Sequence, residues 1–354
     1  MLELRSLRSL RFNILPFSSL PSVARGFIGV LFKLPLNLLY EGDVKMNVRI
    51  AVCSRTELIA EYDKILSFSF GKDVYTPWTS LKASFISDEA SFLTAAEIKL
   101  YIGEKLIHHG LVDRLEQRLE NGVRITSVSS KGFTSLLCRN QLEPGLKTSV
   151  SINSLMDGIY TLPHITHEDN SNTSSYIYVK NGSSIWDGIV NLSYKLTENY
   201  PFISGTNHVR ITPEPLPENF TFVSSDIICM GTEYSYNRTL SHLHMAELDG
   251  IYGSFEYEDT FAASKEIVRH LYFEFDRQFV NEPQQALIYR AKYAKRGSQR
   301  YFCRYSGYRG EDLTDTATFG GISSKKICTI DIKGDSDGIT TEIGVYNDGF
   351  YSAY

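Results

Sequence analysis

SSKGFTSLLCRNQLEPG, residues 129–145, is the stretch from which the fold can be worked out in both directions. Hydroxyl and glycine residues open it, a short amphipathic turn with Phe133, Leu136 and Leu137 follows, and Pro144-Gly145 then turns the chain away. The stretch carries no set of acid, base and nucleophile. We interpret it as the exit from one β domain into a connecting segment, with the three apolar side chains covering the end of that domain.

About eighty residues of strand-like sequence precede this stretch. Apolar and polar residues alternate in several short runs, which is typical of half-buried β-strands. The predicted strands are 47–52, 65–70, 80–86, 97–102, 105–112 and 122–128. Gly103-Glu104 and Glu120-Asn121-Gly122 predict hairpin turns between consecutive strands. This spacing predicts a β-barrel or sandwich, and we assign residues 46–150 to a first β-barrel domain.

Residues 151–212 predict a loop followed by a small α/β insert. The polar segment 161–175 is expected to be an exposed loop, and 175–180 and 208–212 are expected to be strands. Between them, one helical face is apolar, and a proline ends the helix. The residues concerned are Ile185, Ile189, Leu192 and Leu196, followed by Pro201. The insert is therefore predicted to be a βαβ-like unit over residues 175–212.

Residues 213–354 begin with the stiff linker 213–217, which contains three prolines. The clearest helix is 281–297, with Asn281 as its N-cap, Pro283 near its first turn and Gly297 after its end. Further strands are predicted at 220–230, 250–257, 300–305, 326–333 and 340–346. They are expected to form a second β-barrel, and some of them to complete the first. The predicted fold class is mainly β with α/β elements, an α+β protein.

The first 45 residues differ from the rest in composition. They are rich in Leu, Arg and Ser, and they hold six basic and three acidic residues. Their longest uncharged apolar run before Lys33 is 26–32, whereas a transmembrane helix needs about 20 such residues. We therefore expect no transmembrane segment here, and no convincing secretory signal is present.

A transit peptide is one interpretation of residues 1–45. We favour a translated leader, because a purine-rich codon choice for Glu41-Gly42-Asp43 makes a bacterial ribosome-binding site just before Met46. On this hypothesis the native protein starts at Met46, and the leader is not part of the fold. N-terminal sequencing of the native protein tests it, because any residue found before Met46 would contradict it.

Charge and cysteine content bound the function. The whole chain has a net charge of −5, and the part after residue 45 has 30 basic and 38 acidic residues, a net charge of −8. Such an acidic body argues against binding to a nucleic-acid backbone. The five cysteines are scattered and form no C-x-x-C pair, which favours buried free thiols over disulfides or a zinc site. The high aromatic content, 22 Tyr and 20 Phe, favours β structure and protein-facing surfaces.

Candidate metal sites are weak. His242 and His244 share one face of a strand, with Glu247 and Asp249 close behind, but this spacing matches no specific metal motif. A second group, His164, His167, Glu168 and Asp169, is better explained as an exposed polar loop. The run DIKGDSDG at 331–338 lacks the loop length and distal Glu of an EF-hand and predicts a hairpin turn. We predict no metal, cofactor or catalytic residues.

The two tryptophans and a group of basic residues complete the candidates. Trp186 at the start of the predicted insert helix is expected in the core, and Trp78 is expected to pack at a barrel end, with sugar stacking as the alternative. The basic residues are Lys292, Lys295, Arg296 and Arg300. Most of this group is explained by its position near the C-terminal end of the helix 281–297, where positive side chains interact favourably with the helix dipole.

Five stretches of the sequence, taken together and in this order, carry a resemblance to a known family. Each stretch alone is weakly specific. They are WTSLKASFISDEASF (78–92), LIHHGLVDRL (106–115), the opening run 129–145, the segment 176–212 with VKNGSSIWDGIVNLSYKL and ISGTNHVRITP, and 282–297 with the Gly-rich strands to residue 350. Together they resemble the baseplate hub protein family of phage tails and tail-like particles, of the type found in Mu-like phages and in Firmicutes prophages. The resemblance covers most of residues 47–350.

This resemblance implies two related β-barrel domains joined by smaller α/β elements, and a homotrimer whose six barrels match a sixfold tail tube. It implies tail tube, tape-measure and spike or baseplate proteins as partners, and no catalytic residues. The expected function is a structural baseplate hub, a virion structural protein of a phage or prophage, assembled in the cytoplasm of the bacterial host. Two alternatives stay open: a carbohydrate- or receptor-binding tail module, and a tail enzyme that degrades the cell wall.

Overall fold

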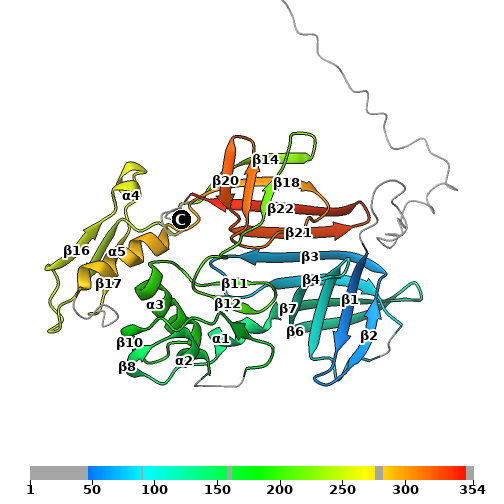
Figure 1. The fold of residues 1–354 in the computed structure, drawn as a ribbon, viewed down its shortest axis with the longest axis horizontal. Coiled ribbons are helices and arrows are strands. Elements are labelled where there is room, and N and C mark those ends of the chain that lie inside the picture. The colour runs from blue at the N-terminus through cyan, green and yellow to red at the C-terminus, as the bar shows by residue number, and fades with distance from the viewer. Residues whose placement is uncertain (1–46, 89–90, 158–161, 276–281, 348–354) are drawn as a thin grey trace, which may run out of the picture. The chain divides into compact units, whose positions relative to one another are not determined.

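One antiparallel sheet of 11 strands is the largest element, and its strands come from both ends of the described chain (Figure 1). The structure is a computed structural model that describes residues 47–88, 91–157, 162–275 and 282–347. The order in the sheet is β14 (Ile227–Tyr234), β18 (Gln299–Ser306), β22 (Gly338–Tyr346), β21 (Thr329–Asp335), β3 (Ile65–Asp73), β4 (Ser80–Ile86), β7 (Val123–Gly132), β6 (Lys105–Glu120), β5 (Glu97–Ile102), β1 (Val48–Cys53) and β2 (Leu58–Tyr62).

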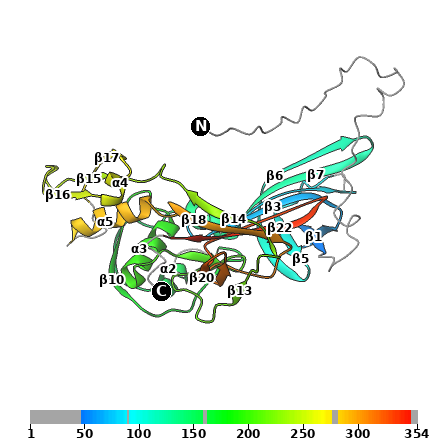
Figure 2. The same ribbon diagram turned by 90° about the horizontal axis from the view of Figure 1, so that it is seen from above.

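Alternation of apolar and polar residues explains these strands. In β4, Leu81, Ala83 and Phe85 are buried, and the residues between them are exposed or half-buried. The predicted turn between β6 and β7 is confirmed: Glu120 pairs with Val123, and Asn121 and Gly122 both have positive φ, at 51° and 79°. This is the backbone that a two-residue hairpin turn of the Asn-Gly type requires. The hairpin of β6 and β7 is long and extends outward in Figure 2.

The mainly β, α+β fold class is confirmed, but the two separate closed barrels are not observed. β21 pairs with β3, with Ile332 opposite Phe70, so strands from the first and last parts of the chain form a single sheet. Among the described residues, the end strands β14 and β2 each have one neighbour, so the sheet stays open. It nevertheless curls through β4, β7, β6 and β5 and brings β1 into contact with β3.

In the described part of the chain, four small sheets and five α-helices accompany the large sheet. The small sheets are β8 (Gly145–Val150) with β10 (Ser174–Val179); β9 (Thr166–His167) with β11 (Phe202–Ser204) and β12 (His208–Arg210); β13 (Asn219–Thr221) with β19 (Thr316–Phe319) and β20 (Ile322–Lys326); and β15 (His242–Met245) with β16 (Phe255–Glu258) and β17 (His270–Phe273). The helices are α1 (Leu136–Arg139), α2 (Ile152–Asp157), α3 (Ile185–Thr197), α4 (Thr260–Ser264) and α5 (Pro283–Ala294).

The insert helix forms as predicted, but the βαβ unit around it does not. Ser184 and Asp187 make a capping box at the start of α3, which satisfies free backbone N–H groups there. β10, before the helix, pairs with β8, whereas β12, after the helix, pairs with β11 and β9. The two strands therefore belong to different sheets. The segment predicted as an exposed loop also contains β9 and the buried Glu168.

The helix predicted at 281–297 is observed as α5, with Pro283 in its first turn. Its N-cap is Glu282, whose side chain makes no capping hydrogen bond, and Asn281 lies outside the described residues. The helix packs on the sheet of β16, β15 and β17. The buried residues of this separate apolar cluster are Leu243, Met245, Ala286, Leu287 and Ala291.

The opening run connects the large sheet to the insert. β7 ends at Gly132, a short 3-10 turn covers Phe133–Ser135, and α1 follows. Phe133 and Leu137 are buried as expected, and Leu136 is only half-buried. Leu142 packs against Gly188 of α3 so closely that a Cβ at Gly188 would lie 2.2 Å from Leu142 Cδ1. The run is therefore a packed junction, while the domain boundaries at 45, 150 and 212 stay predictions.

The described helices are short. None of them is long and apolar enough to cross a membrane. Residues 1–45, with the leader hypothesis that concerns them, lie outside the described residues.

Candidate functional site

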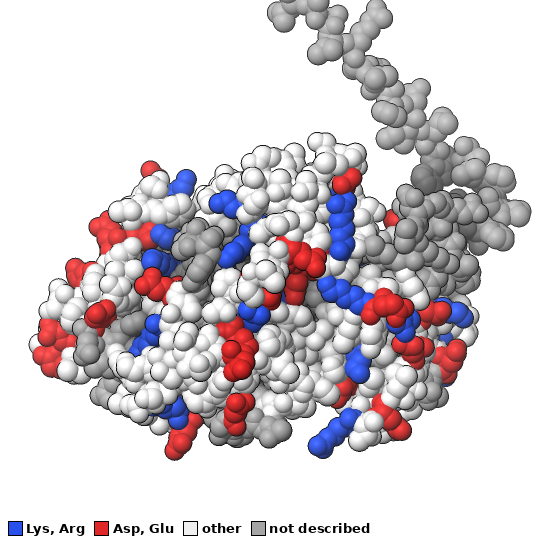
Figure 3. Space-filling view, in the orientation of Figure 1, with Lys and Arg blue, Asp and Glu red and all other residues white. Residues whose placement is uncertain are grey.

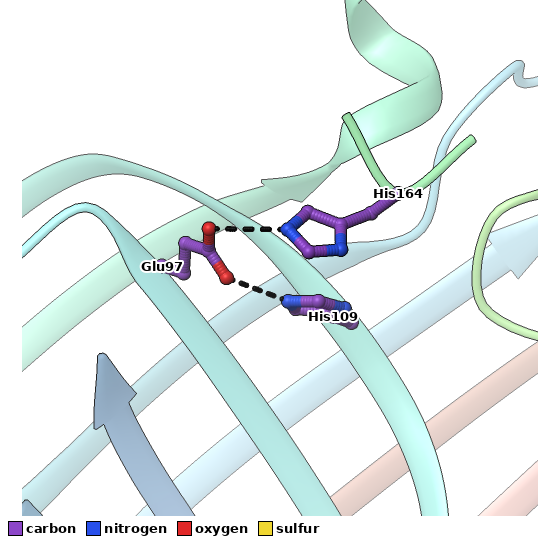
Figure 4. A group of neighbouring side chains, drawn as sticks. All are labelled: Glu97, His109 and His164. Carbon is purple, nitrogen blue, oxygen red and sulfur yellow. Dashed lines mark hydrogen bonds and ion pairs between the residues drawn. The ribbon is translucent and has the colours of Figure 1, made fainter. Parts of the chain in front are cut away.

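Glu97, His109 and His164 form one side-chain cluster from three separate segments (Figure 4). Glu97 begins β5, His109 lies on β6, and His164 precedes β9. Nε2 of His109 lies 2.8 Å from Oε2 of Glu97, and Nε2 of His164 lies 3.3 Å from Oε1 of the same carboxylate. The two imidazoles thus approach one carboxylate, each at a different oxygen.

The β5–β6 hairpin places the first two residues. Lys99 is opposite His109 and Glu97 is opposite Leu111, so Glu97 and His109 are diagonal neighbours on one face. Successive strand residues point to opposite faces, and His108 therefore lies on the other side of β6. There it contacts Thr79 through Nδ1 and Ser130 through Nε2, both at 2.8 Å. Burial lowers the pKa of His108 to about 3, so this histidine is a neutral core residue.

His164 reaches the hairpin from a turn. Its φ is 59°, a left-handed conformation that a non-glycine residue adopts at a cost. The ring centroid of His164 lies 4.5 Å from that of His109 and 4.6 Å from that of Phe133. Phe133 belongs to the opening run, so this run supplies one wall of the cluster. Asn207, from the turn between β11 and β12, adds a hydrogen bond from Nδ2 to the backbone oxygen of His109, at 2.8 Å.

The electrostatics of the cluster are those of a buried carboxylate among imidazoles. The side chains of Glu97 and His109 are each 10% exposed, and that of His164 is 43% exposed. Burial lowers the pKa of His109 and so favours its neutral form, although the hydrogen bond to Glu97 opposes this shift. In the part of the chain that the structure describes, the ion-pair partners of Glu97 are these two histidines. Imidazole and carboxylate groups converging in this way can hold a transition metal.

The sequence pattern predicts no metal site and an exposed polar loop around His164. The other members of that loop group do not join the cluster. His167 pairs with Asp157 at 3.0 Å, Glu168 accepts from Thr212 Oγ1 at 2.8 Å, and Asp169 accepts from Asn153. Glu97 and His109 lie at similar numbers of residues before and after the predicted Gly103-Glu104 turn. Residues placed in this way face each other across a hairpin, and this was the one signal in the sequence for their proximity.

His242 and His244 lie on β15, and they meet His270 of β17. The rings of His242 and His270 stack with centroids 4.2 Å apart, and His244 Nε2 lies 3.2 Å from His270 Nδ1. His244 Nδ1 is paired with Glu256 at 3.1 Å. Glu247 and Asp249 do not approach these rings: Glu247 is hydrogen-bonded to Ser254 and Asp249 to the backbone of Ile251.

The remaining candidates have structural roles. Asp335 pairs with Gly338 in the predicted hairpin turn between β21 and β22. Trp186 is buried and its indole donates to Tyr200 at 3.4 Å, while Lys131 lies 5.4 Å from the ring of Trp78. The basic group is mostly neutralised or stacked: Lys295 pairs with Asp259, Arg300 with Glu342, and Arg296 lies over the Tyr293 ring.

A pocket of about 540 Å³ lies between α4, α5 and the edge of the large sheet. Its lining combines aromatic residues with lysines. The residues are Tyr234, Tyr236, Tyr257, Phe261, Lys265, Lys292 and Lys295, with Ser298, Gln299 and Asn347. Such a surface can stack a flat or sugar-like ring and attract an anionic group.

Comparisons with known proteins identify the fold. No protein-family model matches the chain, and no curated protein sequence does. Among solved structures, the tail protein from Neisseria meningitidis MC58 has a TM-score of 0.63 at 12% identity, over 86% of this chain and 98% of that chain. The 43 kDa tail protein of prophage MuSo2 from Shewanella oneidensis has a TM-score of 0.59 at 11% identity, over 84% and 98%.

A third similar structure is a protein of a secretion system. The E. coli c3393 protein, described as a type VI secretion component similar to the T4 tail proteins gp27 and gp5, has a TM-score of 0.50 at 9% identity. It is covered over 74% of its length, and this chain over 81%. At such low identities the likeness establishes a shared fold. The resemblance to phage tail proteins is thus confirmed for the fold, and the Firmicutes subtype stays a prediction.

Proposed function

We propose that this chain is a structural baseplate hub of a phage tail or tail-like particle, a trimeric adaptor between the tail tube and the central spike. The observation that carries the proposal is the length of the shared fold: two tail proteins are matched over 98% of their own chains. The proposed role is one of assembly, with tube, tape-measure and spike proteins as partners and the virion tail baseplate as its location.

Surface charge agrees with a protein-facing role. On the face shown in Figure 3, basic and acidic side chains are interspersed, without a continuous basic stripe. A nucleic-acid-binding surface needs a concentration of Lys and Arg along a groove or face. This pattern, together with the acidic net charge, supports protein partners.

The edge strand β14 offers a surface for subunit contact. Ile228, Met230 and Tyr234 of this strand are 57%, 53% and 59% exposed. An exposed apolar edge strand is a site at which another chain adds or packs. A ring of three copies needs heterologous contacts that close after three steps, and we assign β14 to one side of that contact.

The oligomeric state tests the proposal. Native mass spectrometry and light scattering of the full chain are expected to show a trimer, alone or on addition of a spike protein from the same tail. A chain that stays monomeric at high micromolar concentration with and without the spike would contradict the hub role.

The aromatic and lysine-rich pocket supports a second candidate, a carbohydrate-binding tail module. Its test is binding to purified cell-wall glycans, which Tyr236→Ala should weaken if the pocket is the site. A zymogram on bacterial cell walls addresses the third alternative, since clearing would identify a cell-wall-degrading enzyme. Neither glycan binding nor clearing is expected of the hub.

A further inference from the structure

The cluster of Glu97, His109 and His164 has the donor set of a transition-metal site. It offers two imidazole nitrogens and one carboxylate oxygen, which is the ligand chemistry that zinc prefers. Calcium and magnesium prefer sites made of oxygen atoms only. Of the described residues, these three form the one group whose ligand atoms converge in this way.

The distances leave only a small adjustment for an ion. The ligand atoms of all three residues lie within 4.8 Å of one another. Around a tetrahedral zinc ion, ligand atoms are about 3.3 Å apart, as follows from metal–ligand distances of about 2.0–2.1 Å. Both contacts to Glu97, at 2.8 and 3.3 Å, are already close to this value. His164, the most exposed member and part of a turn, is the ligand that can move.

Charge points the same way. The Glu97 carboxylate is nearly buried, and in the described residues no Lys or Arg pairs with it. A buried carboxylate needs a counter-charge or several hydrogen-bond donors, because burial removes its hydration. Each histidine offers it a single nitrogen, at 2.8 Å and 3.3 Å. A divalent cation would supply a counter-charge at this point.

We propose that Glu97, His109 and His164 bind one divalent transition-metal ion, of the zinc class, with water in the fourth position. In the absence of the ion, the Nε2–H groups of His109 and His164 donate to the two oxygens of Glu97. On binding, the proton of each ring moves to Nδ1, so that both Nε2 atoms become ligands. The ion ties the β5–β6 hairpin to the segment before β9, and thus joins the large sheet to the sheet of β9, β11 and β12. This metal site is independent of the proposed tail function.

The histidines of β15 and β17 are the competing site. Their donor atoms are already engaged with one another and with glutamates: His244 uses Nδ1 toward Glu256 and Nε2 toward His270. They are arranged as a stack along the sheet rather than around one point. The experiment must therefore separate the two groups.

The test uses the full chain without an affinity tag, stripped with EDTA and dialysed against zinc or cobalt. We expect one zinc ion per chain after dialysis, a tetrahedral Co²⁺ absorption band, and a thermal midpoint that rises by several degrees with zinc. His164→Ala should abolish all three signals, and because its side chain is exposed the variant should still fold. His109→Gln should do the same.

Matched controls are His167→Ala, three residues along the same segment, and His244→Ala on β15. Both should keep stoichiometric zinc and the Co²⁺ band. The proposal is overturned if the wild-type chain retains no zinc, if His164→Ala retains it, or if His244→Ala loses it. Each of these measurements concerns the isolated chain, so a chain that binds no zinc would contradict the metal site and leave the hub role untouched. A chain that binds zinc but stays monomeric with and without the spike protein would contradict the hub role and leave the metal site untouched.

Discussion

The ammonium of Lys72 on β3 pairs with the carboxylate of Asp312, 240 residues further along the chain. The Lys72 side chain is only 4% exposed, and its Nζ also donates to the backbone oxygen of Gly205 at 2.7 Å. Asp312 accepts in addition from the backbone N–H of Gly205 at 2.6 Å. This one ion pair therefore links the large sheet, the β11–β12 turn and the loop before β19.

Asp312→Asn should destabilise the protein strongly. It removes the counter-charge of a buried ammonium, and breaking a buried pair in this way costs about 3–5 kcal/mol. Urea unfolding at pH 7 measures the loss. The matched control is Glu61→Gln, which breaks the more exposed Arg49–Glu61 pair and should cost at most about 1 kcal/mol. If the two variants lose the same free energy of unfolding, the buried Lys72 does not need the carboxylate of Asp312 as a counter-charge.

The cost of Asp312→Asn should shrink at alkaline pH. Burial lowers the pKa of Lys72 below its usual 10.5, and the nearby Asp312 opposes this shift. Loss of Asp312 thus lowers the pKa of Lys72 further. Between the folded pKa and 10.5 the unfolded chain binds more protons, so the stability of the variant rises with pH in that window. Urea unfolding from pH 7 to pH 10 should show the variant approaching the wild type, and a constant difference would contradict this.

Leu137 and Leu136 should respond differently to truncation. Leu137 is fully buried in the junction after β7, whereas Leu136 is half-buried. Leu137→Ala should therefore cost about 2–5 kcal/mol in the free energy of unfolding, and Leu136→Ala clearly less. Leu137→Asp should prevent folding. If the two alanine variants unfold at the same urea concentration, the burial assigned to the junction is wrong.

The thiols should differ in reactivity toward a disulfide reagent at pH 8. Burial raises the pKa of Cys303 to about 11 and that of Cys138 to about 12, so only about one Cys303 thiol in a thousand is ionised at that pH. Cys53 and Cys328 are also buried. Cys229, half-buried on the edge strand β14, should react first. Cys229→Ser should remove the fast phase, and guanidinium should expose all five thiols.

Ile228→Lys should weaken trimer formation and leave the fold intact, because the side chain is exposed on the proposed contact strand β14. A lysine at this position would lose its hydration when the subunits associate, whereas in the isolated chain it stays exposed to water. Leu146→Lys on β8 is the control, since Leu146 is 62% exposed and lies outside β14. Native mass spectrometry with both variants decides: a trimer that survives Ile228→Lys unchanged places the contact elsewhere.

Local pattern predicted much of the secondary structure. β4 and β5 have the predicted bounds, and the helices α3 and α5 form where the 3.6-residue period and Pro283 placed them. Short strands escaped prediction: β19 and β20 were not foreseen, and the strand predicted at 220–230 is divided into β13 and β14. Strands of three to five residues carry too few alternations for a period to be recognised.

Local sequence could predict only part of the candidate site, namely the proximity of Glu97 and His109. A hairpin turn at Gly103-Glu104 sets the register that makes Glu97 and His109 diagonal neighbours, so their proximity follows from local sequence. His164 lies in a polar segment with no period, and its left-handed backbone is held by contacts with Phe133 and the hairpin. No local pattern could place it there.

The sequence by itself thus determined the hairpins, the helix faces and the alternation of buried side chains, because these depend on residues a few positions apart. Only the tertiary structure decided that β3 pairs with β21, which turns two expected barrels into one open sheet, and that His164 meets Glu97. Both contacts close long loops of chain. Their free energy comes from the packing of the whole core, and a local period carries no information about which distant partner that packing selects.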